Sequence, residues 1–561
     1  MNLFSKAKKS NYEIEPDEIF LDARNIPEFD TQQFEGRLEE PIGKRSLAAL
    51  SVAFIIIAAI FTCRIFALGV VRGAHYESIS VENSLDKIPL FADRGIIFDR
   101  NGTLLVSNSV RGESGDFSKR VYPKAPGFSH VLGYVGYPSK DKSGVYWQKD
   151  TIGKSGVEKE FDSVLSGKNG AKLIETNAGG NVNSENVINR PVDGENITLS
   201  IDARVETSLF RALENFAHDF GFEGGAGVIM DVHTGELIAL SSFPEYDSSV
   251  LSEGSDRAEI ARYLSASSKP FLNRALGGVY TPGSIVKPYI ALGALEEGVI
   301  DPLKQILSTG SISVQNPYDP KLKTVFKDNK AHGWVDMRHA LAVSSNVYFY
   351  EIGGGFESQR GLGIANIKKY TSLFGLGQKT GINLPNEQGG NIPSPEWKAA
   401  HFKNDPWRVG DTYNTAIGQY GFQVTPLEMA RAVGGVATEG ELVVPTILHD
   451  DPSPRPTEKI SLSSDSFRIV KEGMRLVVTE GTGVALNTPA VRIAAKSGTA
   501  QVGAHNEFMN SWITGFFPYE NPRYSFAVLV EHGPKTNTTG AAHVMRSVID
   551  DMMLHAPEYM N

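Results

Sequence analysis

An apolar stretch lies close to the N-terminus of this 561-residue chain, running from Ser46 to Val71. A helix of about 20 apolar residues crosses the hydrocarbon core of a bilayer. This stretch is long enough to cross a bilayer if its one charged residue, Arg64, lies near the interface between membrane and water. It is too long for an ordinary core helix. The long segment before it and the lack of a small-x-small cleavage site argue against a secretory signal peptide. We therefore expect a transmembrane helix over residues 45–71.

The charges around this stretch predict its orientation. Lys44 and Arg45 directly precede it, and further lysines lie upstream, whereas only Arg72 follows it closely. Basic residues accumulate on the cytoplasmic side of a membrane span. We therefore expect residues 1–44 to form a flexible cytoplasmic tail. Everything after the single span is expected to lie on the outer side of the plasma membrane.

Composition narrows the classes of partner and cofactor. The formal net charge of -10 leaves no basic excess for neutralising phosphates, which argues against nucleic-acid binding. Cys63 is the only cysteine, so neither an intrachain disulfide nor a cysteine-cluster metal site is possible. Because no motif indicates a metal or a cofactor, we expect neither.

The chain is longer than a single core usually becomes, so more than one domain is expected. Residues 72–220 are strand-rich with many turn signals, and residues 221–561 form the second predicted domain. That domain begins with a predicted hairpin over residues 225–247 and ends with three predicted strands over 492–533 and an amphipathic helix. A helical region lies between them. This order predicts an α+β domain whose N- and C-terminal strands share one antiparallel sheet.

A serine and a lysine stand three residues apart in the segment GGVYTPGSIVKPYIALGAL, as Ser284 and Lys287. Pro288 fits a helix readily only in its first turn, so a helix here must begin close to Ser284. The hydroxyl would then lie at the positive end of the helix dipole, with Lys287 one turn on along the same face. A lysine accepts a proton from a serine only when its amine is neutral, and burial or a second cation lowers a lysine pKa.

Two further short motifs follow in the predicted second domain. Ser344 and Asn346 lie between an apolar approach and an aromatic run, where a polar helix cap is the favoured interpretation of this segment taken alone. Lys496 begins a K-S-G motif on a predicted strand and is a candidate for the second cation. The small residues after it would let a substrate backbone lie along the strand edge. Each motif recurs elsewhere in the chain, so only their order inside one domain is specific.

The order S-x-x-K, S-x-N, K-S-G behind a membrane anchor resembles the class B penicillin-binding proteins. Two segments are similar to the pedestal signature of that family, ADRGIIFDRNGTLLVSN and GKSGVEKEFDSVLSGKNG. Two others resemble its elongation-type branch, penicillin-binding protein 2, namely LFGLGQKTGINLPNEQGGNIPSPEWK and YNTAIGQYGFQVTPLEMARA. The resemblance implies a strand-rich pedestal (dimerisation-like) domain over 72–220. It also implies a β-lactamase-like serine transpeptidase domain over 221–561, with helices flanking the sheet.

The resemblance also implies a role for each residue of the motifs. The implied catalytic residues are Ser284 as nucleophile, Lys287 as general base, Ser344 and Asn346 as proton relay and positioning groups, and Lys496 as a group that tunes the field. The implied substrate-binding residues are Ser497, Gly498 and Thr499. Ser497 and Thr499 would bind the terminal carboxylate of the donor peptide. The backbone N–H groups of Ser284 and Thr499 would form an oxyanion hole.

The implied function is a peptidoglycan D,D-transpeptidase that cross-links stem peptides through a serine acyl-enzyme during cell-wall elongation. β-Lactams would acylate the same serine. A septal transpeptidase and a D,D-carboxypeptidase are alternatives with the same chemistry. An inactive scaffold or a β-lactam sensor is the non-enzymatic alternative, although such sensors usually carry several membrane spans. Implied partners are stem peptides, the membrane, a SEDS-type glycosyltransferase and cell-shape scaffold proteins.

One segment departs from the family pattern. Near residues 111–119 the chain is short where the family usually carries a whole lobe of the pedestal. That lobe is the region through which relatives are thought to meet scaffold partners. We therefore expect the pedestal to lack this lobe.

Overall fold

The computed structural model describes residues 43–76, 85–110, 115–176, 182–316, 319–403, 405–451, 456–503, 505 and 507–560. Most of the predicted tail over residues 1–44 thus lies outside the described residues. The chain divides into two compact units. One comprises Met1–Asp86 with Glu175–Asn183, and the other comprises Lys87–Ile174 with Ser184–Asn561.

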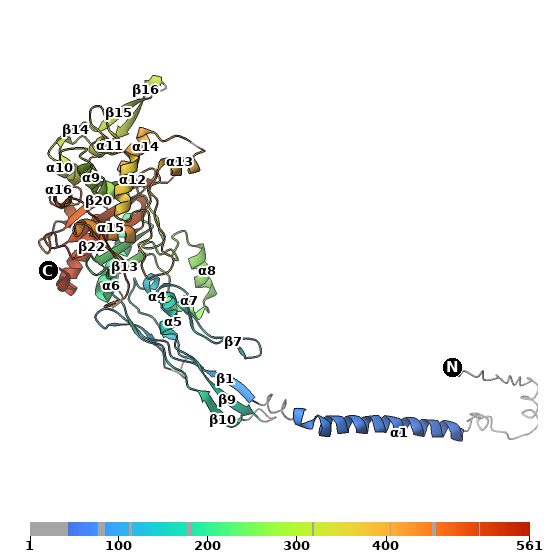
Figure 1. Cartoon of the computed structure of the whole chain (residues 1–561). Helices are drawn as coiled ribbons and strands as arrows, with labels where there is room; N and C mark the ends of the chain where they lie inside the picture. Colours follow the sequence, from blue (N-terminus) through green and yellow to red (C-terminus); the bar gives the residue numbers. More distant parts are fainter. Residues whose placement is uncertain are drawn as a thin grey trace, which may run out of the picture. The chain divides into compact units, whose positions relative to one another are not determined.

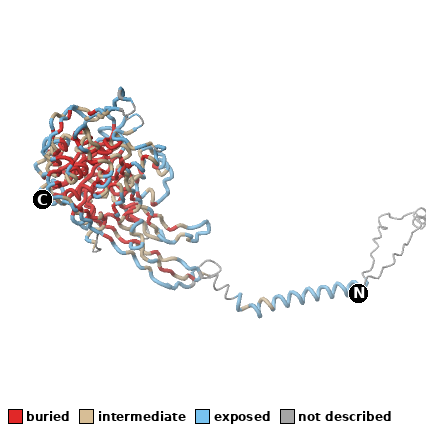
Figure 2. Tube along the Cα trace, turned by 45° about the horizontal axis from the view of Figure 1, so that its top comes forward, coloured by how far each residue is buried: buried red, intermediate tan, exposed pale blue. Residues whose placement is uncertain are grey.

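The first unit contains helix α1 (Lys44–Phe66), which continues as a π-helical turn over Ala67–Val71. None of the residues in α1 is buried, and the helix is drawn as exposed along its length in Figure 2. A mostly apolar helix that the described residues leave exposed suits a lipid environment. By length and composition, the segment Lys44–Val71 is able to cross a membrane.

The pedestal region, most of which belongs to the second unit, is built from short strands and small helices (Figure 1). Its strands are β1 (Leu85–Leu90), β2 (Ile97–Phe98), β3 (Leu104–Asn108), β4 (Arg120–Val121), β5 (Val135–Gly136), β6 (Ser139–Lys140), β7 (Tyr146–Gln148), β8 (Ile152–Gly153), β9 (Gly170–Thr176), β10 (Val182–Asn189) and β11 (Ile197–Thr198). Its helices are α3 (Ser129–Leu132), α4 (Gly156–Glu160) and α5 (Asp162–Leu165). The two larger sheets have the strand orders β1-β9-β10 and β11-β2-β3-β4.

A buried ion triad holds the pedestal together at its signature residues. The Glu158 carboxylate lies 2.5 Å from Arg94 Nε and 2.8 Å from Arg120 Nε, and all three side chains are almost fully buried. Removing one member of such a group would leave an uncompensated buried charge. Arg94 and Glu158, which lie in the two segments similar to the pedestal signature, therefore serve structure together with Arg120.

The strands on either side of the short segment at residues 111–119 pair with each other. Ser107 of β3 lies opposite Val121 of β4, and Asn108 lies opposite Arg120. Residues 111–114 lie outside the described residues. The chain therefore re-enters the same sheet directly after this segment.

The C-terminal part of the second unit contains a five-stranded antiparallel sheet with the order β13-β12-β22-β21-β20. Its strands are β12 (Gly224–Asp231), β13 (Leu237–Phe243), β20 (Ala494–Val502), β21 (Phe508–Phe517) and β22 (Tyr524–Pro534). The hairpin from the start of the domain thus pairs with a strand from its end, which confirms the predicted α+β fold. Successive residues of a strand point to opposite faces, so Val228 and Ile229 enter two different hydrophobic clusters.

Helices cover both faces of this sheet. On one face α6 (Ala203–Phe220) packs with α17 (Ala541–His555), and on the other face lie α15 (Pro426–Ala437) and α16 (Ser464–Thr479). Asp202 caps the first of these helices, because its carboxylate accepts the backbone N–H of Arg204.

The remaining elements form the helical middle of the domain and the short hairpins beside it. These helices are α7 (Ser248–Glu253), α8 (Arg257–Ser265), α9 (Lys287–Glu296), α10 (Met337–Ala342), α11 (Asn346–Gly354), α12 (Ile364–Leu373), α13 (Pro395–His401) and α14 (Val409–Ala416). The strands are β14 (Ile306–Ser308), β15 (Ser311–Asn316), β16 (Asp319–Lys327), β17 (Gly333–Val335), β18 (Glu441–Val443) and β19 (Thr457–Lys459). Short 3-10 turns cover Gly283–Val286, Val484–Leu486 and Pro557–Met560.

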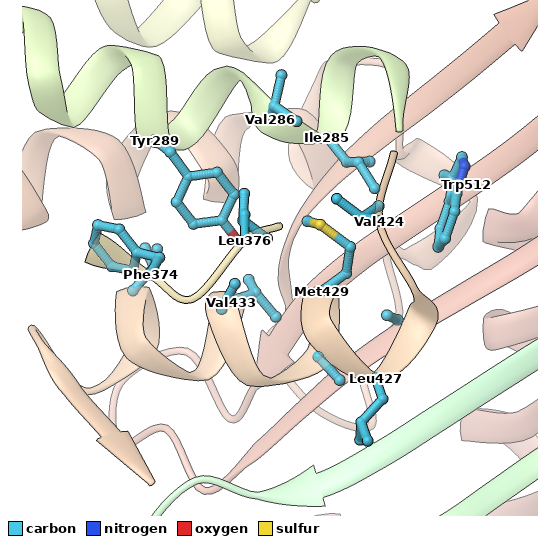
Figure 3. Packing of buried hydrophobic residues seen from close by; sticks show 14 of the residues in the cluster. Ile285, Val286, Tyr289, Phe374, Leu376, Val424, Leu427, Met429, Val433 and Trp512 are labelled. Atoms are coloured by element: carbon cyan, nitrogen blue, oxygen red, sulfur yellow. The ribbon is translucent and has the colours of Figure 1, made fainter. Parts of the chain in front are cut away.

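Helix α9 runs through the centre of the domain, where residues 287–294 are all buried. A helix buried on every side needs apolar residues on every side, and the buried residues of α9 are apolar with the exception of Lys287. Figure 3 shows Tyr289 of this helix beside Phe374 and Leu376, and the ring centroids of Tyr289 and Phe374 are 5.0 Å apart. The core therefore fixes the helix that carries the lysine.

Candidate active site

Ser284 lies in the 3-10 turn Gly283–Val286 that leads directly into α9. Its neighbours Ile285 and Val286 are fully buried, whereas Ser284 is half-buried. Figure 3 shows Ile285 pointing toward Val424 and Met429. Trp512 also anchors this turn, because its Nε1–H donates to the carbonyl of Thr281 at 3.1 Å. The apolar flanks are thus held inside while the hydroxyl remains accessible at the N-terminal end of the helix.

The K-S-G strand β20 passes directly against this turn. A Cβ on Gly283 would lie 2.7 Å from the carbonyl oxygen of Thr499, and a Cβ on Gly498 would lie 2.7 Å from that of Pro282. Gly283 also has a φ of +59°, a conformation that L side chains adopt reluctantly. Glycine at both positions therefore permits the close approach that brings Thr499 beside Ser284.

Strand β20 is the edge strand of the five-stranded sheet. Ser497 and Thr499 lie two residues apart, so their side chains share one face, and both remain partly or fully exposed. An open edge presents free backbone groups to an extended peptide. The edge thus offers the kind of docking strip that the sequence predicts.

Lys287 is 0% exposed, and its side-chain nitrogen is surrounded by hydrogen-bond acceptors. Nζ donates to the Ser344 carbonyl at 2.7 Å and to Asn346 Oδ1 at 2.8 Å, and Ser344 Oγ lies 3.3 Å away. A neutral amine has two N–H bonds and one lone pair. If the carbonyl and the amide oxygen take the two N–H bonds, the lone pair is left to accept a proton.

Lys496, also 0% exposed, approaches the same serine from the sheet. Its Nζ donates to Ser344 Oγ at 2.9 Å and to the carbonyl of Ser497 at 2.8 Å. Ser344 therefore contacts both lysines through one hydroxyl. The three motifs predicted to meet do lie together, since S-x-x-K contacts S-x-N and S-x-N contacts K-S-G.

The Ser344–Asn346 segment is both a helix cap and a lysine-binding turn. Ser344 has a φ of +59°, and Ser345 is the N-cap of α11, where its Oγ accepts the backbone N–H of Tyr348 at 3.3 Å. The polar-cap interpretation is thus correct for Ser345. It leaves Ser344 and Asn346 free to contact Lys287, because the left-handed residue turns both the carbonyl and the hydroxyl of Ser344 toward that amine.

Burial dominates the protonation of the two lysines. It lowers the pKa of Lys287 from 10.5 to about 7, while the negative charge of Asp328 acts in the opposite direction. Burial also lowers the pKa of Lys496 well below its ordinary value, and the charge of Lys287 adds to this effect. Two like charges sharing one hydroxyl repel each other. We infer that the two amines do not both carry a proton near neutral pH.

Ser284 does not yet engage its predicted base. Among the described residues, none makes a hydrogen bond to the Ser284 hydroxyl, including Lys287. Catalytic hydrogen bonds are often loose before substrate binds. The roles of the predicted site residues therefore stay predictions, although Lys287, Ser344, Asn346 and Lys496 are in contact.

Two contacts of the site were not predicted from the sequence. The hydroxyls of Thr482 and Ser497 lie 2.6 Å apart, and the backbone N–H of Thr482 donates to the carbonyl of Ala342, just before the S-x-N motif. Asp328 accepts hydrogen bonds from the first residues of α11. Neither residue belongs to a motif, and no local pattern indicates a partner so distant along the chain.

One group of possible metal ligands occurs among the described residues, formed by Glu236, His449 and Asp450. Arg100 already lies 3.2 Å from the Glu236 carboxylate, which also accepts the backbone N–H of Asp450. The group is better described as an ion-pair network than as a metal centre.

Comparison with known proteins identifies the family. Residues 225–551, more than half of the chain, match the penicillin-binding protein transpeptidase domain, and residues 115–199 match the penicillin-binding protein dimerisation domain. The chain belongs to the penicillin-binding proteins.

Curated relatives place the chain among the class B penicillin-binding proteins, in the branch of penicillin-binding protein 2. The peptidoglycan D,D-transpeptidase MrdA of Acinetobacter baumannii is 32% identical over 465 residues, covering 78% of this chain and 66% of that relative. MrdA of Escherichia coli K12 is 27% identical over 617 residues, covering 91% of this chain and 94% of that relative. The chain thus spans just under two thirds of the first relative and most of the second.

Solved structures agree with this assignment. Penicillin-binding protein 2 of Helicobacter pylori in complex with MreC has a TM-score of 0.69 and 28% identity, covering 84% of this chain and 99% of that one. Penicillin-binding protein 2 of Pseudomonas aeruginosa in complex with WCK 5153 has a TM-score of 0.68 and 30% identity, covering 84% and 97%. The family resemblance and the fold class predicted from the sequence are therefore confirmed.

Proposed function

We propose that this penicillin-binding protein is a peptidoglycan D,D-transpeptidase of cell-wall elongation that acts through an acyl-enzyme on Ser284. One observation carries the proposal. The buried Lys287 amine, with a pKa lowered to about 7, is held by Ser344 and Asn346 one helical turn from an accessible serine. A neutral amine so fixed is suited to act as a general base.

In the acylation step, Ser284 Oγ would attack the carbonyl carbon of the penultimate D-Ala while its proton passes to Lys287 Nζ. The negative charge on the carbonyl oxygen would be met by the backbone N–H groups of Ser284 and Thr499. The C–N bond then breaks, and the leaving D-Ala amine takes a proton. Ser344 Oγ, which contacts both lysines, is a suitable relay for that proton.

In the second half-reaction, an amine of a neighbouring stem peptide would attack the ester carbonyl. The proton lost by that amine would return to Ser284 Oγ through Lys287 as the ester bond breaks. Atoms and protons balance, with one free D-Ala released and one new amide bond formed. β-Lactams would stop the cycle after acylation.

The edge of β20 supports the proposed substrate orientation. An extended stem peptide would pair with this edge, and its terminal carboxylate would be bound by the hydroxyls of Ser497 and Thr499. Thr482 supports Ser497 through the contact between their hydroxyls. The position of Gly498 against Pro282 brings the strand close enough to the serine for this arrangement.

Membrane placement and partners belong to the same proposal. Helix α1 would anchor the protein by one pass, with Lys44 and Arg45 on the cytoplasmic side and the catalytic domain outside. The Helicobacter pylori neighbour was solved together with MreC, which supports a cell-shape scaffold as a partner. The family resemblance supports a SEDS-type glycosyltransferase as a second partner.

Labelling with a fluorescent penicillin tests the central assignment. The wild-type protein should be labelled covalently at Ser284, and Ser284→Ala should abolish the label. Ser139→Ala is a matched control, because Ser139 and Lys142 have the same spacing but lie in the pedestal. This variant should be labelled as strongly as the wild type. Equal labelling of wild type and Ser284→Ala would refute the nucleophile, and an unlabelled wild type would favour the inactive scaffold.

Product analysis separates the two enzymatic alternatives. A transpeptidase should form a cross-linked product from a pentapeptide donor when an acceptor amine is supplied. Rapid release of D-Ala without an acceptor amine would instead indicate a D,D-carboxypeptidase.

A further inference from the structure

Asp328 lies at the base of the hairpin β15–β16, directly after strand β16, which projects from the domain in Figure 1. Its side chain is 0% exposed. A buried carboxylate is costly unless hydrogen bonds or opposite charges compensate it. Asp328 is no part of the three motifs, so its burial requires an explanation.

Four donors from two other segments surround this carboxylate. Oδ1 accepts the backbone N–H of Asn346 at 2.7 Å, and Oδ2 accepts that of Val347 at 3.0 Å. The hydroxyls of Ser345 and Ser308 donate to Oδ2 at 2.7 Å and 3.0 Å. Three of the four donors belong to consecutive residues at the start of α11.

These bonds complete the capping of α11 from outside the helix. Ser345 satisfies the N–H of Tyr348, which leaves the N–H groups of Asn346 and Val347 without a partner in the helix. Asp328 supplies the acceptor for both, and its negative charge is favourable at the positive end of the helix dipole. The same turn presents the Ser344 carbonyl and Asn346 Oδ1 to Lys287.

We propose that Asp328 is a positioning residue for acylation, which holds the turn Ser344–Asn346 in the geometry that orients the Lys287 amine toward Ser284. The inference rests on the proposed function of Ser284 and Lys287. Asp328 touches neither the substrate nor the reacting atoms. It acts through the backbone of Asn346 and through its charge.

The charge of Asp328 acts on the base as well as on the helix. It raises the pKa of Lys287 against the larger effect of burial. Burial acts to raise the pKa of Asp328 itself, but the hydrogen bonds from the start of α11, with a further contribution from the charge of Lys287, lower it below its ordinary value. His332 Nε2 lies 3.8 Å from Oδ1, and its own pKa is lowered chiefly by burial. Two other charged groups lie nearby. The charge of Lys330 lowers the pKa of His332, and Lys496 donates a hydrogen bond to the Ser344 hydroxyl.

An amide in place of the carboxylate cannot reproduce this arrangement. Asparagine has one acceptor oxygen, and its NH₂ group would face a backbone N–H of α11. Asp328→Asn should therefore loosen the turn while also removing the charge that raises the Lys287 pKa. Small displacements of a catalytic group cost about 10²-fold in rate.

The test compares pH profiles of acylation by a fluorescent penicillin in the full-length protein. Asp328→Asn should lower the plateau rate by about 10²-fold and move the acid limb of the profile to lower pH. Asp319→Asn is the matched control, because it removes an exposed carboxylate from the same hairpin. Thermal unfolding of each variant shows whether the fold is retained.

The outcomes separate positioning from a merely structural role. A lower rate together with a shifted limb supports the proposal. If the acid limb of the pH profile does not move, the proposal is overturned, whether the acylation rate of Asp328→Asn matches that of Asp319→Asn or falls only together with the melting temperature.

If Asp328→Asn does not fold, the Ser308→Ala variant provides the test, because it removes one hydrogen bond to Asp328 and keeps the charge. A several-fold slower acylation at an unchanged limb then supports the proposal, and a wild-type rate overturns it. Failure of the wild type to label would refute the proposed function instead.

Discussion

The pH dependence of acylation is a direct test of the buried lysine. A lysine is a base only when neutral, so a general-base role for Lys287 requires acylation to rise with pH through the pKa of this group. That pKa is lowered to about 7 by burial, against an ordinary value of 10.5. The sign follows from the charge: protonation below the pKa removes the lone pair that would accept the Ser284 proton.

The size of the effect follows from the same values. With a pKa of about 7, about half of the Lys287 amines are neutral at pH 7, compared with about one in 3000 for a lysine at 10.5. Burial therefore raises the amount of available base on the order of 10³-fold. Between pH 5 and pH 8 the neutral fraction rises from about 1% to about 90%, so acylation should accelerate about 90-fold and then level off.

Stopped-flow or quenched labelling with a fluorescent penicillin from pH 5 to pH 9 measures this profile. Circular dichroism at each pH shows that the fold is intact, and hydrolysis of the reagent is measured without protein. A profile that is flat, or one that keeps rising toward pH 10, would refute the assignment of a neutral Lys287 as the base at physiological pH. It would do so even if Ser284 were labelled.

Two further substitutions test the geometry around the serine. Gly283→Ala places a Cβ 2.7 Å from the Thr499 carbonyl oxygen and forces an alanine into the left-handed conformation. It should lower the free energy of unfolding by about 1–2 kcal/mol, measured by thermal unfolding. It should also slow acylation by about 10²-fold, measured by labelling with the fluorescent penicillin. Thr482→Val removes the hydroxyl that contacts Ser497 and should raise the KM for a D-Ala-D-Ala donor several-fold with a smaller change in kcat. An unchanged KM in steady-state assays would refute the supporting role of Thr482.

The parts of the site that could be predicted depend on local patterns. Pro288 limits where the helix can begin, and the spacing of Ser284 and Lys287 then places both on one face. Likewise, the alternation along β20 predicts that Ser497 and Thr499 share a face. Such inferences need only a few neighbouring residues. The structure places Ser284 in a 3-10 turn and begins the α-helix at Lys287, so the start of the helix differs from the prediction by a few residues.

The parts that escaped prediction depend on contacts between distant segments. Asp328 lies in a polar segment that resembles any surface loop, and its importance arises only because β16 ends beside the first turn of α11. Thr482 likewise gains its role from the approach of two loops to β20. No periodicity or motif encodes such pairings. The left-handed conformation of Ser344 could not be predicted either, because serine has no particular preference for it.

Ser344 is the point at which the two halves of the site depend on each other. Lys287 comes from the buried helix α9 and Lys496 from the edge strand β20, and within the described part of the chain only Ser344 makes side-chain hydrogen bonds to both. A displacement of β20 relative to α11 must therefore stretch one of these bonds before it disturbs the lysines themselves. Peptide binding at the β20 edge would act on this hydroxyl through Lys496, while Asp328 holds the opposite side of the turn fixed. The Lys287 amine is thus held by the helices and linked to the β20 edge through the Ser344 hydroxyl, which gives a structural reason for the three distant motifs to occur together.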